Sequence, residues 1–158
     1  MGYTHYWRFG PYIAEADYMT ALMECRRLIS ESPVPLGNWE GKAGPLLRDG
    51  FTFNGKGDDA YETFSMKAEP DRDNWFCKTE RRPYDVVVAA CLCVLEDRLG
   101  PRAIHVTSDG DPHEWEDGKA LASRILGRAV PIPVGVRHLE TMKDEYRDHY
   151  LRDHPEYV

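Results

Sequence analysis

Apolar and polar residues alternate over residues 3–9, and this period of two predicts a β-strand. Its inward face would carry four ring-bearing side chains, those of Tyr3, His5, Trp7 and Phe9. Gly10 and Pro11 interrupt the alternation. From residue 12 to residue 30 the apolar positions recur at steps of three and four, which predicts a helix directly after the first strand.

The middle of the chain favours short strands separated by turns. Residues 33–50 are rich in glycine and proline, and we expect a loop there that Trp39 pins to the domain. Alternating runs at 51–53 and 64–66 flank a segment dense in Asn, Gly and Asp, a combination typical of a β-hairpin. A third short strand is expected at 75–77.

The clearest helix of the sequence starts after Pro83 and runs to Leu99, where Gly100 supplies a stop. Its residues are apolar on almost every side, so we expect it to be buried on most sides. A strand at 103–108 follows it. The next helix has a start signal made of a side-chain cap, a proline and an acidic residue, namely Asp111, Pro112 and Glu114.

These elements predict a single α+β domain over residues 1–158, with a small mixed or antiparallel sheet of four to five strands packed with three to four helices. The prolines within 130–136 restrict that segment to an edge strand. Residues 137–158 would form a peripheral helix and tail.

Composition narrows the classes of protein. The apolar run at 86–95 is well short of the ~20 residues that span a bilayer, and no secretory signal precedes the first strand, so we expect a cytoplasmic protein without membrane contact. A net charge of −7 without a clustered cationic face argues against broad nucleic-acid binding. The four cysteines match neither a disulfide frame nor a zinc signature and are expected to be buried thiols: Cys25, Cys77, Cys91 and Cys93.

The segment 105–114 is one candidate site, because it joins the end of a strand to the start of a helix. Asp109 and Asp111, with His105 or His113, would offer oxygen and imidazole groups to a divalent metal ion. Helix capping and a tight turn explain the same carboxylates, and we favour this structural interpretation.

A second candidate site lies just before the Pro83 helix. Lys78, Arg81 and Arg82 could receive a phosphate with help from Thr79, and an aromatic cluster left exposed beside them would suit a nucleotide-like ligand. The same cations would favour the thiolate of Cys77, which makes it a candidate nucleophile. The alternative is that Cys77 packs inward and the basic residues are solvated.

His5 presents a similar choice. It could meet Cys77 or Asp109 across the sheet, since residues distant in sequence form catalytic pairs. We favour a histidine whose hydrogen bonds are satisfied among the neighbouring aromatic rings.

Several blocks of the sequence resemble a set of uncharacterised conserved proteins of bacteriophages and prophages. The resemblance rests on residues 1–7 (MGYTHYW), 53–55 (FNG), 76–79 (FCKT), 82–85 (RPYD) and 108–110 (SDG). It implies a phage accessory protein that acts in the cytoplasm of the bacterial host, and it implies no activity or site residues.

Two classes of function follow. We favour a non-enzymatic binder of a small anionic, nucleotide-like ligand or of a host protein, with no cofactor predicted. The alternative is a small metal-dependent hydrolase or nucleotide-modifying enzyme that uses segment 105–114 and a divalent metal ion. The sequence leaves the oligomeric state open, with a homodimer among the options.

Overall fold

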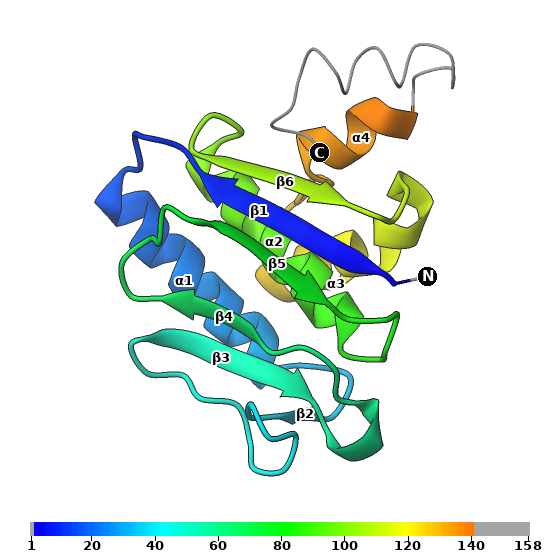
Figure 1. The fold of residues 1–158 in the computed structure, drawn as a ribbon. Helices are drawn as coiled ribbons and strands as arrows, with labels where there is room; N and C mark the ends of the chain where they lie inside the picture. Colours follow the sequence, from blue (N-terminus) through cyan, green and yellow to red (C-terminus); the bar gives the residue numbers. More distant parts are fainter. Residues whose placement is uncertain (1, 141–158) are drawn as a thin grey trace.

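The computed structural model describes residues 2–140, and it shows a single small α+β domain, as predicted (Figure 1). The strands are β1 (Thr4–Phe9), β2 (Leu36–Gly37), β3 (Gly50–Gly55), β4 (Phe64–Lys67), β5 (Asn74–Lys78) and β6 (Ile104–Ser108). The helices are α1 (Glu15–Ser30), α2 (Asp85–Leu99), α3 (Glu116–Leu126) and α4 (Val134–Glu140), with 3₁₀ turns at Gly57–Asp59 and Pro112–Trp115.

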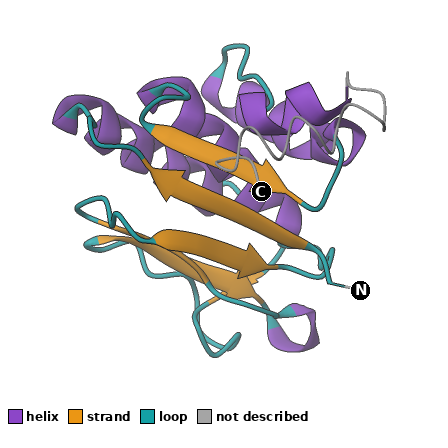
Figure 2. Cartoon of the chain, turned by 45° about the horizontal axis from the view of Figure 1, so that its top comes forward, coloured by secondary structure: helices purple, strands orange, loops and turns teal. Residues whose placement is uncertain are grey.

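The strands form two separate antiparallel sheets of three strands each, in the orders β5-β1-β6 and β2-β3-β4. Each sheet is therefore smaller than the single sheet of four to five strands that we predicted. The two sheets lie side by side with β4 next to β5, and helices α1, α2 and α3 cover one common face (Figures 1 and 2). In the part of the chain that the structure describes, no helix lies on the other face of β1 and β5 (Figure 1).

Strand β1 has the alternation that the sequence predicts. Tyr3, His5, Trp7 and Phe9 are buried under the helices, whereas Tyr6 and Arg8 are exposed on the opposite face. Because β1 is the central strand of its sheet, its pairing with β5 and β6 fixes the position of both neighbours.

Helix α2 is the core of the domain, since every residue from Val87 to Glu96 is buried. It packs against α1 and α3 and also contacts β6. Helices α2 and α3 approach closely at Gly118 of α3, where an added Cβ atom would lie 2.7 Å from Cβ of Ala89. The prediction of a helix buried on most sides is confirmed.

The start signal of the third helix is also confirmed. Oδ1 of Asp111 accepts a hydrogen bond of 3.0 Å from the backbone N–H of Glu114. The first turn is a 3₁₀ turn with Pro112 at its beginning, and α3 proper starts at Glu116.

Two local predictions are wrong. Trp39 does not pin the 33–50 loop, because its side chain is 64% exposed. Asn38 organises this loop instead: its Oδ1 accepts the N–H groups of Glu40 and Lys42. Residues 130–136 do not form an edge strand, since Val134 begins α4.

The remaining sequence predictions concern thiols and membranes. All four cysteines are buried and free, as expected. No helix within residues 2–140 is long and apolar enough to cross a membrane. The predicted helix and tail at 137–158 overlap the end of α4, and beyond Glu140 they lie outside the described residues.

Glu96 is the one buried carboxylate of α2, and it connects this helix to α4. Its Oε2 accepts a hydrogen bond of 2.9 Å from the backbone N–H of Val134. Burial raises the pKa of Glu96 to about 7, and the bond from Val134 offsets only part of that effect.

The raised pKa predicts a specific pH dependence of folding. Between pH ~4.5 and pH ~7 the folded state holds a proton on Glu96 that the unfolded chain has released, so the free energy of unfolding falls as pH rises through this window. In the wild type we expect the free energy of unfolding to fall by on the order of 2–3 kcal/mol between pH 5 and pH 8 because of Glu96. Glu96→Gln should abolish this fall, and urea unfolding at each pH measures it. The same substitution at the exposed Glu40 is the matched control and should keep the wild-type slope. Equal slopes in wild type and Glu96→Gln would contradict the assignment.

Candidate functional site: a tyrosine flanked by cations

The connection between β5 and α2 holds the predicted basic residues in an unusual backbone turn. Glu80 and Arg81 are consecutive non-glycine residues with φ of 53° and 55°, a conformation that costs on the order of 1 kcal/mol or more per residue. The turn is held against the first strand, because the N–H groups of Thr79 and Glu80 both donate to the carbonyl of Tyr3. This reversal sends Arg81 and Arg82 to different neighbours.

Lys78 and Arg82 meet at the ring of Tyr61. The Nζ atom of Lys78 lies 5.7 Å from the ring centroid, and Cζ of Arg82 lies 5.9 Å from it. The Tyr61 side chain is 43% exposed, so a face of the cluster is open to solvent. Its backbone is fixed by the buried Asn54, whose side chain accepts from the Tyr61 N–H and donates to the Tyr61 carbonyl, both at 2.9 Å.

The charge of this cluster is only partly neutralised. Lys78 has a long ion pair of 3.8 Å with Glu80. Arg82 donates to the backbone carbonyl of Asp58 at 3.3 Å and has no carboxylate partner within residues 2–140. A guanidinium with unused donors beside an exposed ring is the combination that binds a planar anion.

Arg81 belongs to a different surface. Its guanidinium lies 4.1 Å from the centre of the Tyr3 ring and forms a 3.1 Å ion pair with Glu114. The cavity of about 320 Å³ beside it is lined by three carboxylates as well as by Arg81 and Arg82. These carboxylates, Asp85, Glu114 and Asp117, make this cavity a poorer anion site than the ring of Tyr61.

Thr79 does not face this cluster, because it is fully buried. Its hydroxyl donates to Oδ1 of Asp85 at 2.5 Å. The same carboxylate oxygen lies 2.6 Å from Nε2 of His5, and Nδ1 of His5 lies 2.8 Å from Oγ of Ser108. Thr79, Asp85, His5 and Ser108 therefore form one hydrogen-bonded chain that joins the β5–α2 turn to β1 and β6, with Thr79 and His5 fully buried and Asp85 and Ser108 half-buried.

This chain has the residue types of a serine hydrolase triad without its geometry. In such triads Nε2 of the histidine faces the serine, whereas here Nδ1 does. His5 is fully buried between the rings of Tyr3 and Trp115, and Ser108 Oγ also accepts the N–H of Gly110 at 2.9 Å. The arrangement fits a structural role, in agreement with the interpretation of His5 that we favoured.

The sequence reasoning placed His5 on the correct face and did not find its partners. Cys77 is directly opposite His5 in the β1–β5 register, yet the hydrogen bonds of His5 go to Asp85 and Ser108. Asp85 is the first residue of α2, but no local pattern in the sequence relates it to His5, 80 residues earlier.

The thiol of Cys77 packs inward. This is the second of the two alternatives that the sequence left open for Cys77, the first being a nucleophile. The residue is fully buried, and its Sγ donates to the Glu62 carbonyl at 3.5 Å. Burial is the main cause that raises the pKa of Cys77 well above its ordinary value. A thiolate is therefore disfavoured despite the nearby cations.

The predicted metal ligands have separate roles. Oδ2 of Asp109 accepts the N–H of Thr4 at 3.0 Å, Asp111 caps the following helix, and His105 lies opposite Arg8 in the β1–β6 register. Among the described residues, no group of three or more His, Cys, Asp or Glu side chains is placed to hold a metal ion. The structure thus favours the capping and turn interpretation of segment 105–114.

Comparison of the chain with protein-family models, with curated proteins and with solved structures gave no match.

The hydrogen-bonded chain predicts a large effect of removing its central member. We expect His5→Phe to lower the free energy of unfolding by on the order of 2–4 kcal/mol, because Asp85 and Ser108 lose a partner inside the domain. Urea unfolding measures the change. Trp39→Ala, at an exposed aromatic position, should stay within about 0.5 kcal/mol of wild type. A loss below about 1 kcal/mol for His5→Phe would show that the chain contributes little.

Proposed function

We propose that the protein is a non-enzymatic binder of a small, nucleotide-like anion, and that Tyr61, Lys78 and Arg82 contact this ligand. The observation that carries the proposal is the exposed ring of Tyr61 between two cations, one of which has no carboxylate partner in the described part of the chain. Of the four residues predicted for this site, Lys78 and Arg82 are the direct contacts.

The chemistry of the ligand follows from these three side chains. An aromatic face stacks on a base regardless of its identity, and such stacking contributes on the order of 1–3 kcal/mol. Arg82 offers a planar fork of donors that suits a phosphate, and Lys78 adds a mobile point charge. A ligand that combines a flat ring with one or more phosphates uses all three groups.

Thr79 and Arg81 have indirect roles in this proposal. Thr79 holds Asp85 and so fixes the turn from inside, and Arg81 holds the turn from outside through Tyr3 and Glu114. The backbone cost of Glu80 and Arg81 is therefore offset by contacts that orient Arg82 towards Tyr61.

The setting that we propose is the cytoplasm of a bacterial host, where the protein would act as a phage accessory protein. This part of the proposal rests on the resemblance of the sequence blocks and on the net charge of −7. His5 and Cys77 are both fully buried, so neither side chain is placed to react with a ligand in solution. Their burial supports binding rather than catalysis.

A host protein is the second candidate for the ligand, because the helix-free face carries an exposed aromatic pair. Tyr6 and Phe76 are directly opposite each other on β1 and β5 and are 37% and 60% exposed. Phe76→Ser separates the two candidates: it would weaken a protein contact on this face and leave both phosphate contacts in place.

The anion site predicts a charge-dependent affinity. Isothermal titration calorimetry with a panel of nucleoside mono-, di- and triphosphates should identify a ligand whose affinity falls as salt is raised. Lys78→Ala/Arg82→Ala should weaken it at least ~10-fold, because each charge-assisted contact contributes about 1.5–3 kcal/mol. Tyr61→Phe should keep most of the affinity, whereas Tyr61→Ala should lose it.

Arg48→Ala is the matched control for this experiment. It removes one positive charge from an exposed position outside the Tyr61 cluster. We expect an affinity within about twofold of wild type. A nucleotide that binds equally well to the wild type and to a Lys78→Ala/Arg81→Ala/Arg82→Ala triple variant would show that the anion site is elsewhere.

A further inference from the structure

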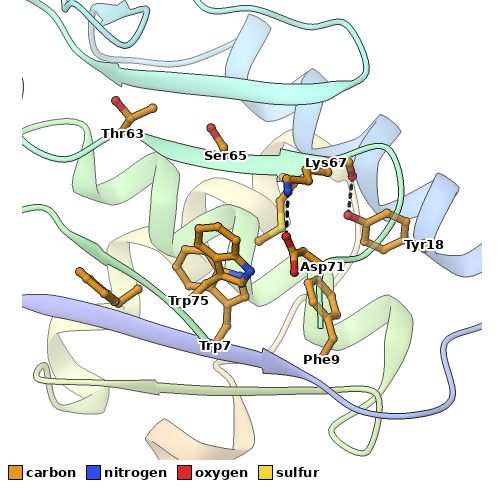
Figure 3. A pocket seen from close by; sticks show the side chains of 10 residues that line it. Trp7, Phe9, Tyr18, Thr63, Ser65, Lys67, Asp71 and Trp75 are labelled. Atoms are coloured by element: carbon orange, nitrogen blue, oxygen red, sulfur yellow. Dashed lines mark hydrogen bonds and ion pairs between the residues drawn. The ribbon is translucent and has the colours of Figure 1, made fainter. Parts of the chain in front are cut away.

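A slot separates the two sheets, and it lies between the neighbouring strands β4 and β5 (Figure 3). At one end the backbones meet, since the N–H of Glu62 donates to the carbonyl of Lys78 at 3.1 Å. The side chain of Glu62 also accepts the N–H of Lys78 at 2.6 Å. At the other end the chain itself closes the slot through residues 68–73, where Lys67 and Asp71 form a 2.8 Å ion pair. The slot is therefore closed at both ends.

The backbone of β5 presents unpaired polar groups to this slot. Both the N–H and the carbonyl of Lys78 point towards Glu62 and so away from β1. Because backbone directions repeat every second residue of a strand, the N–H and carbonyl of Phe76 point the same way. β4 and β5 belong to different sheets and are not paired with each other. The N–H and carbonyl of Phe76 therefore face the slot.

The backbone of β4 does the same from the opposite side. The N–H and carbonyl of Thr52 both pair with Leu46 at 2.9 Å, on the side of β3 that is turned away from β4. Thr52 and Ser65 are directly opposite each other, so theirs is a non-hydrogen-bonded pair, and the N–H and carbonyl of Ser65 point away from β3. Ser65 and Phe76 thus present one donor and one acceptor each to the space between them.

The walls of the slot are aromatic. The cavity has a volume of about 180 Å³, and its deep side is formed by buried residues, Trp7, Phe9, Tyr18 and Met66. Trp75 lies directly opposite Trp7 in the β1–β5 register and is 39% exposed, so it forms the rim (Figure 3). Flat indole faces beside polar strand edges match a flat ligand with a polar perimeter.

The slot offers no unpaired charge. Lys67 and Asp71 are the charged residues that line it, and they pair with each other (Figure 3). Nζ of Lys67 also lies 5.8 Å from the ring of Trp75, and the Lys67 carbonyl already accepts the hydroxyl of Tyr18 at 2.6 Å. A neutral ligand fits these walls better than an ion does.

We propose that this slot binds a neutral planar heteroaromatic ring of the nucleobase class. The ring would lie against Trp7 and Trp75, and its edge donors and acceptors would pair with the backbones of Ser65 and Phe76. An extended peptide would also pair with two strand edges, but a strand cannot run through a slot that is closed at both ends by the Glu62–Lys78 bonds and by residues 68–73. The slot is a second site, and it does not depend on the anion site at Tyr61.

Backbone amide NMR of the ¹⁵N-labelled full chain tests this assignment. Adenine, cytosine and uracil are the probes, and indole is the matched flat ring without an acceptor edge. We expect at least one base to shift the amide signals of Ser65 and Phe76 and the indole signals of Trp7 and Trp75 saturably, with Kd on the order of 0.1–1 mM. Indole should bind at least ~10-fold more weakly, because it has no acceptor for the N–H groups of the strand edges.

Two variants report on the two halves of the site. Trp75→Ala removes the rim and should weaken base binding at least ~10-fold, while Trp39→Ala removes an exposed tryptophan elsewhere and should leave it unchanged. Ser65→Pro removes the donor that faces the slot without removing a β3–β4 hydrogen bond, and Ser65→Ala is its control with the donor intact. If Ser65→Pro does not fold, Trp75→Ala and the comparison with indole still test whether the slot binds a base.

Three outcomes would overturn the proposal. The first is that no base produces saturable shifts up to about 10 mM. The second is that indole binds as well as the bases, which would show that the strand edges recognise nothing. The third is that Trp75→Ala leaves base binding unchanged, which would show the same of the rim.

Discussion

The structure depends on the burial of helix α2 on all sides along its central part. From Val87 to Glu96 every residue is buried, so the helix is stable only when α1, α3 and the sheets surround it together. Such a helix also fixes its own first residue. Asp85 is held there at 2.6 Å from His5, and this bond ties the start of α2 to the central strand β1. The β5–α2 turn, with its two left-handed residues, is thereby held between two rigid elements.

Much of the fold was predictable because it depends on local patterns. The alternation of β1, the all-round apolar character of α2 and the cap at Asp111 each act within a few residues, and each is confirmed. Segment 130–136 failed for a local reason as well. A short apolar run with prolines suits an edge strand, but proline is equally suited to the first turn of a helix, and the Pro133 carbonyl accepts the N–H of Val136 in that role.

The candidate site was predictable only in part, because its geometry depends on contacts between distant segments. The basic residues before Pro83 were apparent, and so was the use for an aromatic ring beside them, yet nothing in the sequence identifies Tyr61 as that ring. Arg81 and Arg82 contact different rings because Glu80 and Arg81 have positive φ. Neither residue type favours positive φ, so the sequence does not predict this turn. The bonds of His5 span 80 residues to Asp85 and 103 to Ser108, so they require the register of three strands to be known.

Strand β5 explains why both proposed sites lie in the same region. A hairpin such as β4–β5 ordinarily closes into a ladder, because unpaired strand edges expose backbone groups that must find other partners. Here the pairing stops at Lys78, because its N–H donates to the side chain of Glu62 and not to a backbone carbonyl. At the other end of the opening, Lys67 and Asp71 form an ion pair. The same residue, Lys78, therefore closes the slot with its backbone and points its ammonium group at Tyr61. An interruption that is fixed at both ends and lined by tryptophan is better explained as a place for a ligand than as a defect of strand pairing, because its aromatic walls lie beside backbone groups that have no strand partner.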